Sequence, residues 1–224
     1  VVEDKSFPRN QNLYALIFIY KYNNLFNLHV LEGDFKESLK IIPEVLVGIE
    51  INKNFIDHHH IMLLYFKIAC MYFTVNDYDN CIKYVNMIMI NKNIKMREDL
   101  QCFTRILNLI AHWEAGRDYN LDKIIRETYN YLDKMNDLHD VQKTILKYLN
   151  GLENIYPGEI KGFLRSLHSE LKKFEDDPYE KRAFLYLDII SWLESKINNK
   201  PVAEIIKEKA LHINRKEKQT TVLI

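Results

Sequence analysis

Glycine and proline are scarce in this sequence, with 6 and 5 residues among 224. Both residue types are common in the turns that join short strands, so their scarcity argues against a protein built from many short strands. The sequence has instead apolar residues at helical spacing and many aromatic rings, among which tyrosine is the most frequent, with 14. We therefore expect an all-α protein in which such rings fill the grooves between packed helices.

The sequence also lacks an excess of charge of either sign, because 31 basic residues balance 31 acidic ones. A field that would attract nucleic acid or an anionic membrane is therefore not expected. The apolar stretch from Leu13 to Leu31 is interrupted by polar residues, including Lys21 and His29, too closely for a membrane-spanning helix. We accordingly expect neither a nucleic-acid partner nor a membrane.

Cysteine is rare as well, and Cys70, Cys81 and Cys102 all lie inside apolar periodic stretches. An odd number of cysteines in this setting favours reduced core thiols and a cytoplasmic location, with a reactive or metal-binding thiol as the alternative. The sequence contains no phosphate-binding glycine-rich loop, nucleophile elbow or Cys-x-x-Cys pair, so we expect neither a common enzyme class nor a cofactor. Because the chain opens on Val1 rather than Met, we expect either the C-terminal part of a longer protein or a processed product.

A polar turn segment recurs between apolar stretches of helical periodicity. It reads Leu31-Glu32-Gly33-Asp34-Phe35, then Val75-Asn76-Asp77-Tyr78-Asp79, then Ala115-Gly116-Arg117-Asp118-Tyr119. A tight turn that returns between paired helices is typical of helical-hairpin repeats.

The apolar periodicity predicts about ten helices. Their expected ranges are 9–32, 34–52, 57–75, 77–91, 95–115, 121–136, 138–154, 158–174, 178–198 and 201–213. Pro43 is expected to bend the second helix. No linker rich in Ser, Gly or Pro divides the chain, so we expect a single domain over residues 1–213. Residues 214–224 are expected to form a C-terminal tail that is frayed or held by a partner.

The hairpin from Tyr65 to Ile90 resembles a tetratricopeptide repeat. The large, aliphatic, small and aromatic positions of that family's first helix fall on Tyr65, Ile68, Ala69 and Tyr72, and the small, bulky and small positions of the second helix fall on Cys81, Val85 and Ile88. The first hairpin matches less well, with Phe26 where a small residue is expected. The turns are about 43 and 40 residues apart, whereas the family's repeat has roughly 34, which implies longer helices or loops. The chain as a whole is similar to divergent bacterial members of this superfamily.

The resemblance implies a right-handed α-solenoid of antiparallel helix pairs that acts as a non-catalytic scaffold for protein–protein interaction. Family members hold an extended peptide in a concave groove lined by the first helix of each pair. The positions that would face this groove are Asn23, Asn27, Phe66, Cys70 and Phe73. The implied partner is a protein or peptide, or a second copy in a homodimer. Of the residues that form the carboxylate clamp of chaperone-binding members, only Asn27 has a counterpart here, which argues against that particular function.

Two further interpretations stay open. A nucleic-acid-binding or regulatory repeat protein would need a basic stripe along one face. A metal-binding protein or enzyme would use the cluster His58-His59-His60, because imidazole binds metals and titrates near neutral pH. Consecutive residues on a helix point about 100° apart, however, so three in a row cannot converge on one ion. A helix start capped by Asp57 is therefore favoured for this cluster.

His112 has Trp113 and Glu114 as neighbours, a combination that could indicate a pocket. In the repeat register its side chain faces the partner helix. We therefore expect a packed core histidine.

Overall fold

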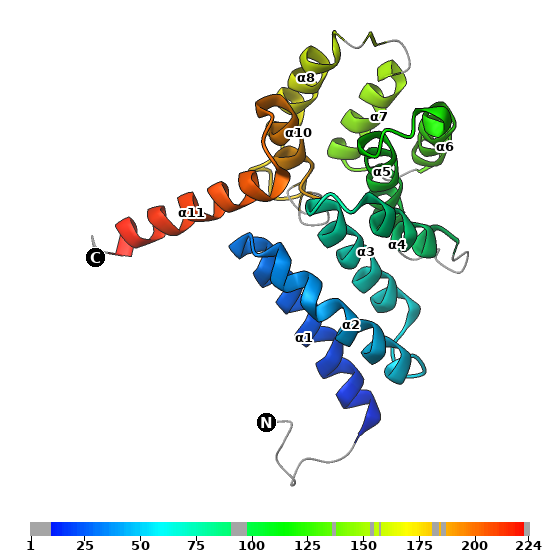
Figure 1. Cartoon of the computed structure of the whole chain (residues 1–224), viewed down its shortest axis with the longest axis vertical. Coiled ribbons are helices and arrows are strands. Elements are labelled where there is room, and N and C mark those ends of the chain that lie inside the picture. The colour runs from blue at the N-terminus through cyan, green and yellow to red at the C-terminus, as the bar shows by residue number, and fades with distance from the viewer. Residues whose placement is uncertain are drawn as a thin grey trace.

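The computed structural model describes residues 10–90, 98–135, 138–152, 155–156, 158–180, 184 and 187–221. Over these residues the protein is entirely helical, with ten α-helices, one short 3-10 helix and no strand, which confirms the expected all-α class (Figure 1). The helices are α1 (Gln11–Glu32), α2 (Phe35–Asn52), α3 (His58–Thr74), α4 (Tyr78–Ile90), α5 (Glu98–Glu114), η1 (Asp118–Asn120), α6 (Leu121–Asp133), α7 (Asp140–Leu152), α8 (Ile160–Lys172), α10 (Ile189–Asn198) and α11 (Val202–Thr221).

The three recurring turns adopt the same backbone geometry. Gly33, Asn76 and Gly116 all have a positive φ, between 63° and 68°. In each turn the N–H of this residue donates to the carbonyl three residues earlier, and the next N–H donates to the carbonyl five residues earlier, at 2.8–3.1 Å. This is the pattern that closes a helix through a left-handed residue and satisfies its last carbonyls. The turn segment that recurs in the sequence therefore also recurs in the structure, with the same backbone geometry.

A fourth left-handed turn lies between α10 and α11, at Asn199 (φ 52°). Its separation from Gly116, 83 residues, is about twice the spacing of 43 and 40 residues between the earlier turns. The sequence analysis did not include Asn199 in the series, because its neighbours Asn198 and Lys200 do not resemble the earlier turn segments.

The α3–α4 hairpin packs as its repeat register predicts. The two small positions, Ala69 and Cys81, are fully buried, which lets the two helices approach closely. The larger side chains fill the remaining groove, where the rings of Tyr72 and Tyr84 stack with their centroids 5.8 Å apart. Val85 is fully buried on the same side of α4. The residues that carry the resemblance are therefore the ones that join these two helices.

Helices that are consecutive in the chain also pack against each other, from α1 through to α8. The first helices of successive pairs are in contact too, α1 with α3 and α3 with α5. The C-terminal hairpin departs from this order. Helix α11 packs against α1, and Trp192 of α10 packs against Trp113 of α5 with the ring centroids 5.7 Å apart. Such contacts between distant hairpins are absent from an open row in which each repeat touches only its neighbours.

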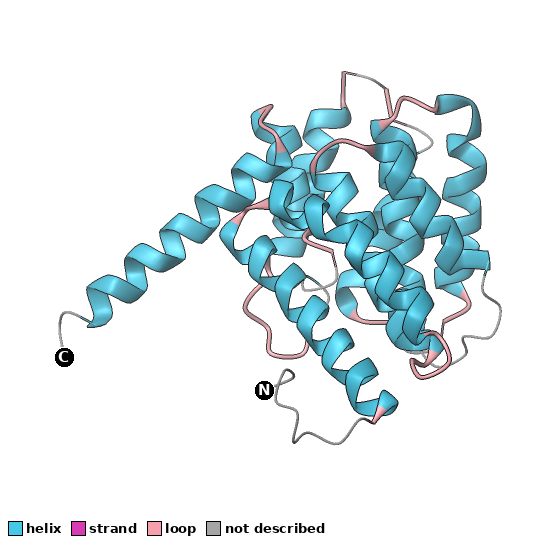
Figure 2. Cartoon of the chain, turned by 60° about the horizontal axis from the view of Figure 1, so that its bottom comes forward, coloured by secondary structure: helices cyan, strands magenta, loops and turns pink. Residues whose placement is uncertain are grey.

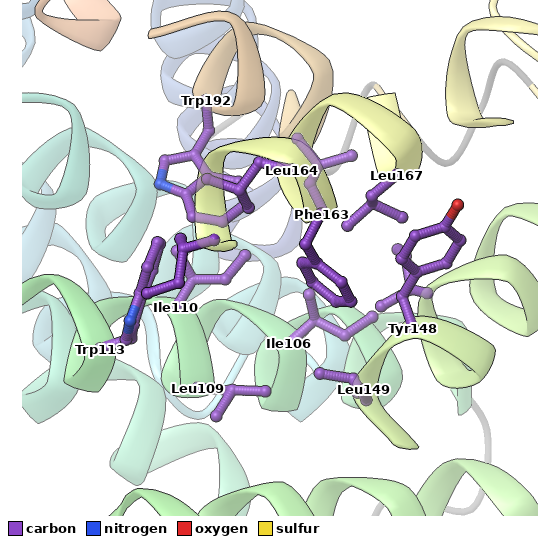
Figure 3. Close-up of a pocket in the computed structure, with 13 residues that line it drawn as sticks. Ile106, Leu109, Ile110, Trp113, Tyr148, Leu149, Phe163, Leu164, Leu167 and Trp192 are labelled. Carbon is purple, nitrogen blue, oxygen red and sulfur yellow. The ribbon is translucent and has the colours of Figure 1, made fainter. Parts of the chain in front are cut away.

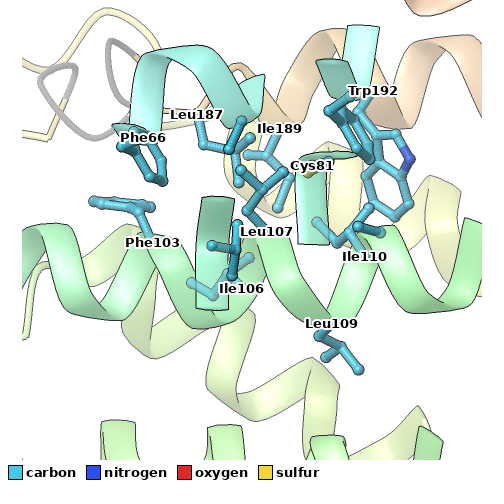
Figure 4. Packing of buried hydrophobic residues seen from close by; sticks show 14 of the residues in the cluster. Phe66, Cys81, Phe103, Ile106, Leu107, Leu109, Ile110, Leu187, Ile189 and Trp192 are labelled. Carbon is cyan, nitrogen blue, oxygen red and sulfur yellow. The ribbon is translucent and has the colours of Figure 1, made fainter. Parts of the chain in front are cut away.

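The core is centred on α5 (Figure 4). Phe66 of α3 lies over Phe103 of α5, and Leu187 and Ile189, just before and at the start of α10, lie on the side of α5 that carries Leu107. The C-terminal part of α11 extends away from the packed helices (Figure 2).

The C-terminal region differs from its prediction in two ways. Within the helix expected over residues 178–198, residues 178–180 form a turn and α10 begins at Ile189, where the Asp188 side chain caps it by accepting from the N–H of Ser191 at 2.9 Å. Residues 181–183, 185 and 186 of the expected range lie outside the described residues. The helix expected to end at Ile213 continues to Thr221, so residues 214–221 of the predicted tail are helical in backbone. Pro43 lies inside α2 as predicted.

Among the described residues, no helix is both long enough and apolar enough to cross a lipid bilayer.

The contact between α1 and α11 can be tested at Gly33. A Cβ atom there would lie 2.9 Å from Cβ and 3.0 Å from Cα of Lys207 on α11, whereas a Cβ at Gly116 would have no described atom within 4 Å. Both glycines have the same left-handed φ, so alanine costs about 1 kcal/mol of backbone strain at either position. We expect Gly116→Ala to lower the free energy of unfolding by about that amount, and Gly33→Ala by about 2–4 kcal/mol because α11 must also move. Urea denaturation measures both, and equal losses would show that α11 does not rest on this turn.

Candidate interaction site

The five predicted groove residues lie on α1 and α3, but they do not all reach the surface. Phe66 and Phe73 are buried in the core. Asn23 is half-buried, and its Oδ1 has no hydrogen-bond partner among the described residues. Asn27 is exposed, and its Oδ1 accepts from Nζ of Lys67 on α3 at 2.5 Å. Neither Phe66 nor Phe73 is available to a partner in this conformation. The accessible part of the predicted groove is therefore the edge formed by α1.

Cys70, the fifth groove residue, is half-buried and reduced. Burial raises the pKa of its thiol to about 12, even though Lys67 opposes the shift. Cys81 and Cys102 are buried and reduced, and burial raises their pKa values too, for Cys102 to about 12. The nucleophilic form of cysteine is the thiolate, so none of the three is activated for chemistry at neutral pH. None of the three cysteines forms a disulfide, and two of them, Cys81 and Cys102, lie in the core as expected.

Helix α1 carries an apolar stripe on its solvent side, which contains Asn27. The exposed fractions of Leu16, Tyr20 and Leu31 are 47%, 63% and 67%, and Asn24 and Asn27 are exposed between them. These residues are spaced by four, four, three and four positions, so they lie along one face of the helix. We call Leu16, Tyr20, Asn24, Asn27 and Leu31 the α1 surface. It carries no charged side chain.

A polar cleft of about 400 Å³ lies where the α3–α4 turn, the end of α5 and the α10–α11 hairpin meet. Glu114, at the end of α5, is its central group, with a side chain only 7% exposed. Its carboxylate accepts from Nε1 of Trp192 at 2.6 Å and forms an ion pair with Lys196. Both partners come from α10, so this carboxylate ties the C-terminal hairpin to the centre of the molecule.

Tyr78 lies at the same cleft, at the start of α4. Its hydroxyl donates to Oδ1 of Asn76 at 2.8 Å and is 3.5 Å from Oε2 of Glu114. Burial, together with the neighbouring carboxylate of Glu114, raises the pKa of Tyr78 to about 12. Tyr78 is therefore a neutral hydrogen-bond donor throughout the physiological range. The carboxylate of Glu114 already accepts from Trp192 and pairs with Lys196, so Glu114 is not free to act as a general base in this conformation.

A second carboxylate, Glu194, joins the C-terminal helices at a point away from the cleft. It is 19% exposed and contacts Lys209 of α11 at 2.9 Å and His168 of α8 at 3.2 Å. Burial by itself would raise the pKa of Glu194, but the hydrogen bonds from Lys209 and His168 outweigh it and hold the pKa below its ordinary value of 4.5. The ionised form of Glu194 is thus stabilised in the folded state.

The histidine cluster starts a helix, as favoured above. Asp57 caps α3 by accepting from the N–H of His60 at 2.9 Å, and it also contacts the ring of His60. Across the described parts of the chain, no three His, Cys, Asp or Glu side chains are grouped so that they could hold a metal ion. His112 is half-buried on α5, and burial lowers its pKa, with Arg117 adding to the effect.

The grouping at Glu114 could not be predicted from the sequence. Trp192 and Lys196 are 78 and 82 residues away in the chain, and a glutamate at a helix end ordinarily belongs to a solvated face. The neighbouring Trp113 was noted, but no local pattern pairs it with α10.

Comparison with known proteins adds no relative: no protein-family model, no curated protein and no solved structure matches the chain.

The role of Glu114 can be measured by substitution. Glu114→Ala leaves the Trp192 N–H and the Lys196 ammonium without their partner, and we expect it to lower the free energy of unfolding by about 2 kcal/mol, discounted because Lys196 is partly exposed. Glu114→Gln keeps an acceptor for Trp192 and should cost less. Chemical denaturation compares the variants, and two equal losses would mean that the indole hydrogen bond contributes nothing.

The lowered pKa of Glu194 predicts that the stability of the folded protein depends on pH. Its pKa is lower in the folded protein than in the unfolded chain, so its contribution is complete above about pH 4.5 and is lost as the pH falls through the folded pKa. Glu194→Gln should remove this component. We therefore expect the wild-type protein to lose more stability between pH 7 and pH 3 than Glu194→Gln does, as followed by urea denaturation at each pH. Parallel curves for the two proteins would contradict this assignment.

Proposed function

We propose that this protein is a tetratricopeptide-like, non-catalytic scaffold, arranged as a solenoid of helix pairs, that binds a protein partner in the cytoplasm. The observation that carries the proposal is the α1 surface. Helix α1 presents Leu16, Tyr20 and Leu31 to solvent on one face. Large exposed apolar side chains gathered on one face of a helix mark a site of protein interaction. The recurring turns and the small residues of the α3–α4 hairpin support the repeat character.

The chemistry of the α1 surface defines the kind of partner that it fits. Its apolar side chains can be buried by an apolar helix face or strand, and Asn24 and Asn27 can hydrogen-bond to the polar atoms of that segment. The side chains of the α1 surface are uncharged, so the part of a partner that covers Leu16, Tyr20 and Leu31 should be uncharged too, because burying an unpaired charge there is costly. The edge at Asn27 differs, since Asn27 accepts from the ammonium of Lys67. The three reduced thiols support a reducing compartment.

A second copy of the chain is an alternative occupant of the same surface. A two-fold axis would place α1 antiparallel to its copy, so that Leu16 of one chain faces Leu31 of the other. No like charges would oppose each other in that arrangement, because the α1 surface is neutral. Light scattering of the purified protein decides between a monomer and a dimer.

The proposal is tested by placing a photo-crosslinking residue at position 20 and purifying the complexes from the cells that produce the protein. We expect crosslinked peptides from one defined protein, or from a second copy, at position 20. The matched control position is Tyr179, which is 80% exposed and lies outside the α1 surface. It should give no such product.

The variants Leu16→Glu and Leu31→Glu should abolish the crosslink at position 20 while changing the free energy of unfolding by no more than about 0.5 kcal/mol, as is usual for exposed positions. Crosslinking that is equally strong at positions 20 and 179, or that persists in both glutamate variants, would refute a specific partner at this surface.

A further inference from the structure

A cavity of about 60 Å³ lies between α5, α7, α8 and α10, on other helices than the α1 surface (Figure 3). Its inner walls are buried aliphatic side chains, among them Ile106 on α5, Leu149 on α7 and Leu164 on α8. Ile189 and Trp192 close it from the side of α10. The C-terminal hairpin therefore forms one wall, and the central helix forms the opposite one.

Two pairs of aromatic rings flank the cavity. Trp113 and Trp192 meet edge to face at one end, with their planes at 77°. Tyr148 and Phe163 meet at 63° at the other end, with centroids 5.2 Å apart. Trp113, Tyr148 and Phe163 are only half-buried, so a ligand can enter between rings that are partly in contact with solvent.

The polar atoms of Trp192 and Tyr148 do not face the cavity. Nε1 of Trp192 donates to Glu114 at 2.6 Å, outside the apolar lining, and the hydroxyl of Tyr148 points away from the other lining side chains (Figure 3). Apart from the indole of Trp113, the remaining described lining residues have hydrocarbon side chains. The space exceeds the roughly 10–15 Å³ that one water molecule needs, but a water would lack the two to four polar partners that hold it in a buried site. An apolar occupant fits this chemistry.

We propose that this cavity is a binding site for a short, uncharged hydrocarbon group. Its volume corresponds to about four to six water-sized positions, which suits an aliphatic chain of about four to six carbon atoms. The aromatic edges at both ends provide contact with such a chain, and the described residues that line the cavity include no cation that would hold a carboxylate or a phosphate. Charged ligands of the same length are excluded by the cost of desolvation.

The protein supplies its own reporter for this site, because its only two tryptophans, Trp113 and Trp192, both line the cavity. The probe is 1-bromobutane, whose bromine quenches indole fluorescence on contact. We expect quenching that saturates with increasing 1-bromobutane. The charged analogue 4-bromobutanoate should quench only in proportion to its concentration, by collision.

Two substitutions at one position locate the binding. Leu164→Phe fills the cavity, and we expect it to raise the Kd for 1-bromobutane at least about tenfold. Leu164→Met conserves volume and should leave the Kd within about twofold. Circular dichroism checks that both variants are folded. Saturable quenching that Leu164→Phe leaves unchanged, or quenching that never saturates in the wild-type protein, would overturn the proposal.

A second measurement needs no variant. Methyl resonances of Ile106, Ile110 and Leu164 should shift when 1-bromobutane is added to the unmodified protein, whereas those of Val45, buried in α2, should not. Shifts of the same size at Val45 and at the cavity methyl groups would also overturn the proposal.

Discussion

The burial of α5 on nearly every side is the constraint on which the other helices depend. From Leu100 to Ala111 every residue of α5 is buried except Arg105, and the guanidinium of Arg105 lies 3.8 Å from the ring centroid of Tyr131 on α6. A helix that is apolar on one stripe can be covered by a single neighbour, but a helix buried all round needs cover from several directions. Helices α3, α4 and α6 provide part of that cover, and side chains of α7, α8 and α10 lie along the remaining side.

Three polar side chains of α5, those of Gln101, Thr104 and Asn108, are buried. Thr104 donates to the carbonyl of Leu100 at 2.7 Å, and Gln101 donates to the carbonyl of Ile88, at the end of α4, at 3.4 Å. Oδ1 of Asn108 has no hydrogen-bond partner among the described residues, so the burial of α5 leaves one of these amide groups only partly satisfied. The long-range polar contacts are instead collected at its C-terminal end, where Glu114 meets α10.

Local features of the fold could be predicted from the sequence because they depend on neighbouring residues. A glycine or asparagine that can adopt a left-handed φ marks each turn, and the small residues Ala69 and Cys81 mark a close crossing of two helices. The caps at Asp34 and Asp57 are of the same kind: each carboxylate accepts from an N–H three residues ahead. Signals of this range can be recognised in a single sequence.

The placement of the C-terminal hairpin could not be predicted, because nothing local specifies which distant face an apolar helix will cover. Phe66 and Phe73 have the periodicity of a groove-lining face, and this periodicity is the same whether the face meets a partner, solvent or the rest of the chain. Glu114 illustrates the converse case. A carboxylate at a helix end is ordinarily solvated, and only the return of α10 converts it into the buried partner of Trp192 and Lys196.

The contact of α11 with the first hairpin, near Gly33, changes how a row of helix pairs loses its structure. In an open array the outermost units have one neighbour each, so they fray first and the array unzips inward. In this protein the α1–α2 hairpin and the α10–α11 hairpin contact each other. Each therefore has a second neighbour, and neither behaves as a free end. Disordering either hairpin removes support from the other, which makes melting a collective event of the described helices instead of a stepwise retreat from the termini.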